Sequence, residues 1–306
     1  MVDWLSYVCF RVVYQLLGAI PHRILVALFG GVWLLLFKLV PRLKSTIESN
    51  LKIAFPGRDR AWYRGLISRH AREMGRLTAD IIRLPSIDEQ WVRRNVEFRG
   101  EESYRSAHRE RGVLIATGHL GSFELLGYIV GLRGTPVAAI ARRFKSERLN
   151  AWWETMRCAG GNSIIDRNGA LKKMIRALQK NVSVAVLFDQ NVKRKHAEFV
   201  PWFSSLAATT KSLAVACLQT DCPVFIASIK YGAEDGKYHI LFEELDIWDV
   251  RRDTDISEGD KINRITAEIS NAFCARITEF PEGWFWTHRR WKTRPDGEEK
   301  SPYSSK

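Results

Sequence analysis

Two side chains that together could move a proton stand five positions apart in the stretch 118-GHLGSFELLG-127, directly after the apolar run 112-GVLIAT-117. They are His119 and Glu124. Imidazole is the side chain best suited to proton transfer near neutral pH, and a hydrogen-bond partner fixes its tautomer. Gly118 and Gly121 permit a tight turn that would bring Glu124 back to the histidine. The spacing favours a general base with its orienting carboxylate, although a polar surface turn whose charges never meet has the same pattern.

The elements around this stretch predict an α/β fold. After residue 111, short apolar runs alternate with helical stretches. The expected strands are 113–117, 136–141, 163–166, 182–188, 223–230 and 238–245, and the expected helices include 169–180, 211–220 and 258–280. Such alternation indicates a mixed, partly parallel sheet flanked by helices. His119 and Asp189 both follow predicted buried strands, at the edge where ligands gather in open sheets, so we expect both in the site. A G-x-S-x-G motif is missing, which argues against a serine hydrolase with a covalent intermediate.

The N-terminal part of the chain is unusually apolar. Residues 4–20 and 24–40 are hydrophobic segments, and the uninterrupted core of the second is short of the roughly 20 residues that span a bilayer. Basic residues bracket this segment and no small-residue cleavage site follows, so we predict a membrane-anchoring helix. A buried core helix and a cleaved signal peptide are the alternatives. The expected division is an anchor (1–45), a catalytic domain (46–295) and a polar, disordered tail (296–306), with helix 59–83 beginning at Asp59 as N-cap.

The composition indicates an anionic partner. The chain of 306 residues carries a net charge of +13 and eleven tryptophans, which suits an anionic membrane surface or an acidic carrier protein, and also nucleic acid. The motifs of nucleic-acid-binding folds are missing, and such a protein would have no use for the apolar N-terminus. The five cysteines are scattered without metal-site spacing, so we expect reduced thiols and neither a metal nor a cofactor.

Several motifs together resemble one enzyme family. The His-x4-Glu of 119-HLGSFE-124 is similar to the His-x4-acid motif of the glycerolipid and lysophospholipid acyltransferase superfamily. Within it, the chain resembles the Gram-negative lipid A biosynthesis acyltransferases, which transfer lauroyl or myristoyl groups. The matching stretches are 50-NLKIAFP-56, 139-AIARR-143, 166-DRNGALKKMIRALQK-180, 188-FDQ-190, 199-FVPWF-203, 208-ATT-210 and 284-WFWTHRRWKTRP-295. The resemblance runs from the N-terminal apolar segment to about Pro295.

The resemblance implies transfer of a fatty acyl chain from an acyl carrier protein thioester to a hydroxyl of a lipid A precursor. His119 and Glu124 would form the catalytic base without an acyl-enzyme, and backbone N–H groups of the glycine loop or an arginine would stabilise the oxyanion. It places the enzyme on the cytoplasmic face of the inner membrane, in contact with anionic lipid. No metal or cofactor is needed for this chemistry.

The substrate-binding residues expected from the same resemblance lie in three places. Arg142 and Arg167 follow two predicted strands, and Asp189 follows a third. His288, Arg289 and Arg290 belong to the block 284-WFWTHRRWK-292, which either holds a phosphorylated headgroup or packs as a core segment with its basic residues in water.

Three alternatives stay open. Another acyltransferase of the same superfamily would act on a different glycolipid or an aminolipid, with coenzyme A as the carrier of the acyl group. A non-enzymatic membrane scaffold would be indifferent to changes at His119. Each arginine named above could equally form a structural ion pair. The remaining histidines lack an acidic partner at a telling spacing, and we assign them no role.

Overall fold

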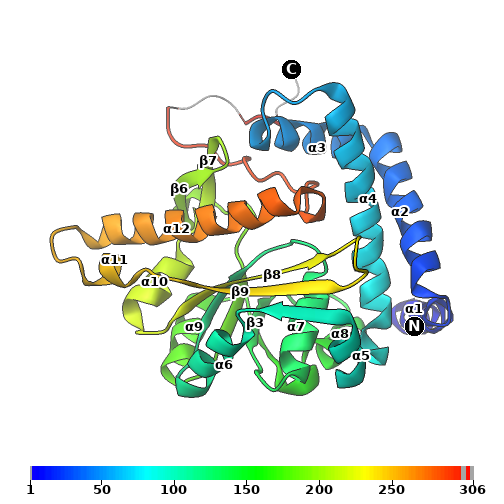
Figure 1. Ribbon diagram of the computed structural model, residues 1–306, viewed down its shortest axis with the longest axis horizontal. Coiled ribbons are helices and arrows are strands. Elements are labelled where there is room, and N and C mark those ends of the chain that lie inside the picture. Colours follow the sequence, from blue (N-terminus) through cyan, green and yellow to red (C-terminus); the bar gives the residue numbers. More distant parts are fainter. Residues whose placement is uncertain (1, 298–300, 304–306) are drawn as a thin grey trace.

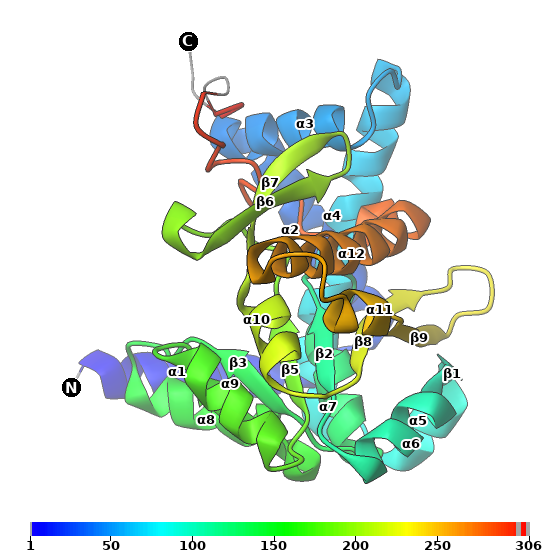
Figure 2. The ribbon, with the colours of Figure 1, turned by 90° about the vertical axis from the view of Figure 1, so that its left-hand side faces the viewer.

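A seven-stranded sheet forms the centre of the computed structural model, which describes residues 2–297 and 301–303 (Figures 1 and 2). In sheet order the strands are β1 (Val96–Arg99), β9 (Tyr238–Leu245), β8 (Val224–Tyr231), β2 (Leu114–Thr117), β5 (Val184–Leu187), β3 (Ala138–Ala141) and β4 (Ser163–Asp166). The five strands from β8 to β4 run parallel to one another. Strand β9 is antiparallel to β8, and β1 runs parallel to β9. The expected mixed, partly parallel sheet is confirmed.

Helices cover both faces of the sheet, and each face has its own hydrophobic core. One core joins α9 (Ala170–Gln179), α10 (Ser212–Gln219) and α12 (Glu258–Glu279) to Leu114 and Ala116 of β2. The other joins α5 (Glu89–Asn95), α6 (Glu101–Glu110), α7 (Phe123–Leu132) and α8 (Glu147–Arg157) to Ile115 and the preceding Val113. Successive residues of a strand point to opposite faces, so the all-apolar run 113–116 is what a strand buried on both sides requires.

Four helices form the N-terminal part. They are α1 (Val2–Gly18), α2 (His22–Leu39), α3 (Pro41–Ala54) and α4 (Arg60–Arg83), and α2 packs along α4 at one side of the sheet (Figure 1). Asp59 is the N-cap of α4 as expected, because its side chain accepts a hydrogen bond from the backbone N–H of Trp62. The region expected to hold one anchoring helix contains two helices, α1 and α2. Of these two, α2 is long and apolar enough to cross a membrane, judged by length and composition.

A two-stranded hairpin and the C-terminal segment complete the fold. The hairpin β6 (Ala197–Trp202) and β7 (Ser205–Thr210) extends toward α3, where the Ser204 hydroxyl donates to the Ile53 carbonyl at 2.6 Å. The short helix α11 (Trp248–Arg252) precedes α12. Within the expected disordered tail, the Tyr303 hydroxyl hydrogen-bonds Asn50, so this part of the tail packs against α3 rather than extending freely.

Candidate active site

The site lies where four parallel strands end. His119 follows β2, Asp189 follows β5, Arg142 follows β3 and Arg167 follows β4. Because these strands are neighbours and run in one direction, their carboxyl ends meet along one edge of the sheet. This is the edge at which open α/β sheets bind their ligands.

His119 is held by Asp189 through two hydrogen bonds. Nδ1 of the imidazole lies 2.8 Å from Oδ1 of Asp189, and the backbone N–H of His119 donates to Oδ2 at 2.9 Å. Burial lowers the pKa of His119, but the charge and hydrogen bond of Asp189 outweigh it, so the pKa is raised above 6.5. Burial raises the pKa of the Asp189 carboxyl, yet His119 and its other donors lower it to about 2. Asp189 is therefore a carboxylate that keeps the Nδ1 proton in place.

The tryptophan-rich C-terminal segment supports this pair from behind. Nε1 of Trp284 donates to Oδ2 of Asp189 at 2.8 Å. The backbone N–H of Phe285 donates to the His119 carbonyl, and the N–H of Gly121 donates to the Gly283 carbonyl, each at 3.0 Å. Gly121 has a positive φ of 60°, and a Cβ there would meet the Ile229 carbonyl oxygen at 2.2 Å, so the loop requires glycine.

Glu124 does not take the orienting position expected for it. Its two carboxylate oxygens bind Nε and Nη2 of Arg157 on α8, with the Nε bond at 3.0 Å. The orienting carboxylate of His119 is Asp189, and Glu124 acts on the imidazole only through its charge. The reason is geometric. Glu124 lies in the first turn of α7, whereas the turn at 118–121 directs the imidazole toward the end of β5. Arg157 was not identified from the sequence, since it lies 33 positions from Glu124.

A cleft of about 1280 Å³ opens beside His119, Glu124 and Arg157. Part of its wall is apolar. The residues of this part come from α7, α8, β9 and the segment before β3, and they include Leu126, Val130, Val137, Met156 and Phe242. Its rim is basic, with the side chains Arg142, Arg157, Arg167, Lys172, Lys193 and Lys195. Among the lining residues that the structure describes, Glu124 is the one carboxylate. The cleft thus combines a surface for an apolar chain with a rim for anions.

The arginines and the histidine expected to bind substrate divide into two groups. Arg142 and Arg167 are exposed and line the cleft, as expected. Arg290 is fully buried, where Nη1 donates to the Ala208 carbonyl at 2.8 Å and the guanidinium lies over Trp202, so it cannot contact a headgroup. Its burial lowers its pKa to about 10.

The neighbours of Arg290 are also engaged by other parts of the protein. His288 accepts a hydrogen bond from the Asn191 backbone N–H at 2.8 Å, and burial lowers its pKa to about 4. Arg289 lies 5.5 Å from the Tyr303 ring. Neither residue is among those that line the cleft. The block 284–292 is therefore a core segment, which is one of its two expected interpretations. Its three tryptophans pack with Trp202 in the interior, where all four rings are fully buried and meet tilted or edge to face.

A second carboxylate reaches the catalytic loop from α4. Asp80 is 3% exposed, and its Oδ2 accepts a hydrogen bond from the Ser122 hydroxyl. Its Oδ1 is bound by Nε2 of His22 at 2.7 Å and by the Tyr238 hydroxyl at 2.6 Å. Asp80 therefore joins the first residue of α2 to the loop between His119 and Glu124. His22 has an acidic partner after all, one that lies 58 positions away.

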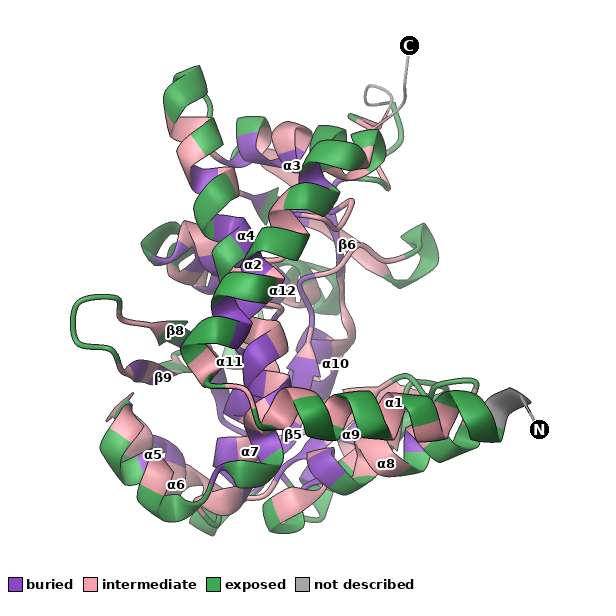
Figure 3. Ribbon diagram, turned by 90° about the vertical axis from the view of Figure 1, so that its right-hand side faces the viewer, coloured by how far each residue is buried: buried purple, intermediate pink, exposed green. Residues whose placement is uncertain are grey.

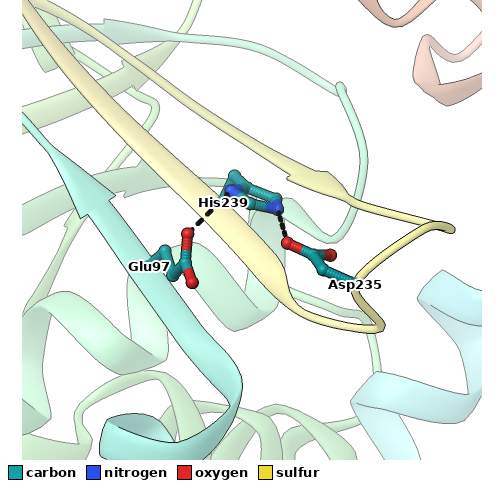
Figure 4. A group of neighbouring side chains, drawn as sticks. All are labelled: Glu97, Asp235 and His239. Atoms are coloured by element: carbon teal, nitrogen blue, oxygen red, sulfur yellow. Dashed lines mark ion pairs between the residues drawn. The ribbon is translucent and has the colours of Figure 1, made fainter.

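A further group of possible metal ligands lies elsewhere on the sheet (Figure 4). His239 on β9 lies between two carboxylates, with Nε2 2.8 Å from Asp235 and Nδ1 3.7 Å from Glu97. The two carboxylates sit on opposite ring nitrogens, and the Lys237 ammonium lies 2.6 Å from Glu97. The Lys237 ammonium and the two ring nitrogens already occupy these carboxylates as partners, so we interpret the group as a polar link between β1 and the β8–β9 hairpin. His239 is a second histidine with an acidic partner that the sequence analysis missed.

The whole chain, apart from its last residues, matches one family. The model of the bacterial lipid A biosynthesis acyltransferases matches residues 1–293. The chain is 25% identical over 299 residues to a lipid A biosynthesis palmitoleoyltransferase of Escherichia coli (strain K12), covering 96% of this chain and 93% of that protein. It is equally 25% identical over 300 residues to the lauroyltransferase of the same strain, with the same coverage. A phosphatidylinositol mannoside acyltransferase of Mycolicibacterium smegmatis is 22% identical over 74% of this chain and 72% of that protein. The chain belongs to the bacterial lipid A biosynthesis acyltransferase family and is an acyltransferase of lipid A biosynthesis.

Proposed function

We propose that this enzyme transfers a fatty acyl chain from an acyl carrier protein thioester to a hydroxyl of a lipid A precursor, with His119 as general base. One observation carries the proposal. His119 has Nδ1 bound to a buried carboxylate and lines a cleft that is apolar on one wall and basic at its rim. A hydroxyl acceptor, an acyl chain and anionic groups need these three features together.

The tautomer that Asp189 imposes determines which ring nitrogen of His119 accepts the proton. With Nδ1–H donating to Asp189, Nε2 carries the lone pair, which accepts a hydrogen bond from the Gln190 side-chain amide at 3.3 Å until the acceptor hydroxyl takes the place of that amide. Nε2 takes the proton of the acceptor hydroxyl as its oxygen attacks the thioester carbon. The tetrahedral intermediate then expels the thiol, which receives the proton from Nε2–H, so ester and free thiol form without an acyl-enzyme.

Arg157 is the better candidate for the oxyanion that develops on the thioester carbonyl. Three N–H groups of the glycine loop are already used, since His119 donates to Asp189, Leu120 to Gly118 and Gly121 to Gly283. Arg157 lines the cleft and its charge acts on His119. We propose that Glu124, expected from the sequence to be catalytic, is a positioning residue for Arg157, because its bidentate contact fixes the plane of the guanidinium.

The rim of the cleft supports anionic substrates. Arg142 and Arg167 are placed to bind phosphate groups of a lipid A precursor, and Lys172, Lys193 and Lys195 extend the same charge. The phosphopantetheine arm of a carrier protein is also joined to that protein through a phosphodiester, and the net charge of +13 attracts an acidic carrier. Asp189, which the sequence suggested as a substrate ligand, is reserved for His119 in this scheme. The proposed location of the enzyme is the cytoplasmic face of the inner membrane, where its apolar N-terminal helices hold it to anionic lipid.

A second acceptor is a different glycolipid. The mannoside acyltransferase of Mycolicibacterium smegmatis matches 74% of this chain, and its name gives a different glycolipid as the acceptor. An aminolipid acceptor or a coenzyme A donor would use the same base. Both would still place the acyl chain in the apolar part of the cleft.

The test is acyl transfer by the purified enzyme. Carrier-protein thioesters of several chain lengths are offered with a tetra-acylated lipid A precursor bearing sugar acid, and coenzyme A thioesters run in parallel. His119→Ala, Asp189→Ala and Glu124→Ala accompany the wild type, each checked for folding by circular dichroism. Transfer by the wild type that collapses in folded His119→Ala supports the base. Inactive wild type with these substrates, or an active His119→Ala, would overturn the proposal.

A further inference from the structure

The pair of N-terminal helices forms one flat apolar face on the outside of the molecule. Helix α1 extends sideways from the N-terminal end of α2, and both turn exposed residues toward the same side of the molecule (Figure 3). The exposed apolar residues of α1 are Trp4, Leu5, Val12, Val13 and Leu16, and those of α2 are Ile24, Leu28, Val32, Leu35, Leu36 and Leu39. Such a large apolar area on one face marks an interaction surface.

We infer that α1 and α2 lie flat in the interface of an anionic bilayer, and that α2 does not cross it. This inference rests on the membrane attachment in the proposed function and goes beyond it. Helix α2 has 18 residues, so it is about 27 Å long and could span by length alone. What it packs against excludes that arrangement.

The first obstacle is α4, which lies against the inner side of α2. Gly75 of α4 meets Gly30 of α2 so closely that a Cβ on Gly75 would lie 2.4 Å from the Gly30 nitrogen. Leu25, Val26, Gly30 and Phe37 of α2 are buried. A bilayer around α2 would therefore also surround α4, whose sequence contains the arginines 60, 64, 69, 72, 76 and 83. Charged side chains facing hydrocarbon are strongly unfavourable, so the pair cannot span as it is packed.

The second obstacle is α1, which precedes α2 and touches the catalytic domain. The Phe10 and Tyr14 rings lie 4.7 and 4.8 Å from the Trp152 ring of α8, both edge to face. The Tyr14 hydroxyl donates to the Ile81 carbonyl at 2.9 Å. If α2 crossed a bilayer, α1 and the catalytic domain would lie on opposite sides, and these contacts could not form.

Charge complementarity identifies the occupant of the face as an anionic lipid surface. The exposed cations Arg23, Lys38, Arg42 and Lys44 lie at the two ends of α2. Helices with an apolar outer face and flanking cations lie in the plane of the interface, about 5–10 Å deep. The arrangement also brings the bilayer next to α8, which supplies Trp153, Met156 and Arg157 to the cleft. A lipid acceptor can then reach the cleft without leaving the membrane.

Depth measurements on the full chain test the inference. In a background without the five native cysteines, single cysteines replace Ile24, Leu28, Leu35, Leu39, Leu5 or Leu16, and Glu102→Cys on α6 serves as the solvent-exposed control. Each variant is spin-labelled and bound to vesicles of phosphatidylethanolamine and phosphatidylglycerol, and depth is read from oxygen and nickel-chelate accessibility. We expect one shallow depth at all six sites. A depth that is greatest at Leu28 and falls toward both ends of α2, or solvent-like values throughout, would overturn the inference.

A binding assay with matched variants separates this inference from the proposed reaction. Leu5→Asp and Leu16→Asp on α1 should each weaken vesicle binding about tenfold or more, because each removes a buried leucine from the lipid interface. Val182→Asp changes an exposed apolar residue away from this face and should leave binding unchanged. Equal effects of all three variants would contradict the in-plane arrangement. Acyl transfer is assayed separately, so an active enzyme with a spanning depth profile refutes only this inference, and a flat profile without transfer refutes only the reaction.

Discussion

Nδ1 of His119 lies 2.8 Å from Oδ1 of Asp189, a residue 70 positions further along the chain. The two residues end neighbouring parallel strands, so the sheet itself sets their separation. Together they form the charge pair on which the proposed reaction depends, and its electrostatics can be measured.

The pH dependence of transfer should report this pair. Asp189 raises the pKa of His119 above 6.5, and only neutral His119 is a base, so kcat/KM should fall as the pH drops through a value above 6.5. Asp189→Asn removes the raising charge and leaves burial, which lowers the pKa. We expect the acidic limb to move to lower pH while the rate above it falls about 10²–10⁴-fold. If the acidic limb keeps its position in Asp189→Asn, a group other than His119 is responsible for that limb.

The Glu124–Arg157 pair should matter for catalysis more than for folding. Arg157→Lys replaces the two-pronged contact by a point charge, and we expect kcat to fall at least tenfold with little change in KM. Glu101 and Arg133 form a matched control, since they are also bidentate and partly buried but lie outside the cleft. Arg133→Lys should leave kcat unchanged. If both lysine variants lose the same activity, the pair at the cleft is only structural.

Ser122 should be a positioning residue for the catalytic loop. Ser122→Ala leaves a lone pair of the buried Asp80 unpaired, and we expect about 1–2 kcal/mol less free energy of unfolding together with a lower kcat. Ser183 is the matched control, a fully buried serine that accepts from the Val113 backbone N–H at 3.0 Å at the start of β2. Ser183→Ala should cost similar stability and spare kcat. Equal kcat in the two variants would show that the contact between Ser122 and Asp80 has no role in the reaction.

Arg290 should contribute to stability, and Arg142 and Arg167 to substrate binding. Arg290→Met removes the side-chain donors of the Ala208 carbonyl and of the Thr209 hydroxyl oxygen in the interior, and we expect the free energy of unfolding in urea to fall by about 2–4 kcal/mol with KM unchanged. Arg142→Met and Arg167→Met are exposed changes that should alter stability by no more than about 0.5 kcal/mol while raising the acceptor KM. A raised KM in Arg290→Met, with KM unchanged in Arg142→Met and Arg167→Met, would instead assign substrate binding to the block 284–292.

Gly127 should control acyl chain length. It lies on α7 in the cleft wall, and a Cβ added there meets no atom within 4 Å, so a larger side chain enters empty space. We expect Gly127→Leu to fold and to discriminate against longer acyl chains, by about 0.8 kcal/mol or fourfold for each methylene it excludes. Competition between thioesters of different lengths measures this, and Gly127→Ala should show a smaller shift. Unchanged selectivity in Gly127→Leu would place the acyl chain elsewhere.

The sequence predicted six of the seven strands of the sheet, because short apolar runs mark them. Strands β2, β4, β8 and β9 begin and end within one residue of the expected positions. The edge strand β1 and the hairpin β6–β7 were missed, since Val96–Arg99 alternates with charges and the short apolar run 199–203 contains Pro201, which argues against a strand.

At the site, local spacing misled where the fold brings distant residues together. Glu124 is close to His119 in sequence, yet Asp189, Arg157 and Asp80 reach the loop through the sheet, α8 and α4. Sequence placed Asp189 at the right edge because strand ends can be read from the pattern, but which side chain meets which nitrogen depends on helix directions that no local pattern encodes. Arg290 was misjudged because an arginine can be buried when backbone carbonyls accept its hydrogen bonds.

The strap formed by Gly283, Trp284 and Phe285 behind the catalytic loop also has a consequence for biosynthesis. These residues bind Gly121, Asp189 and His119, and they follow every strand of the sheet in the chain. A nascent chain that has completed every strand of the sheet still lacks the support for its base. The enzyme should therefore acquire activity only once this strap has been synthesised and packed, by which time its N-terminal helices are already complete.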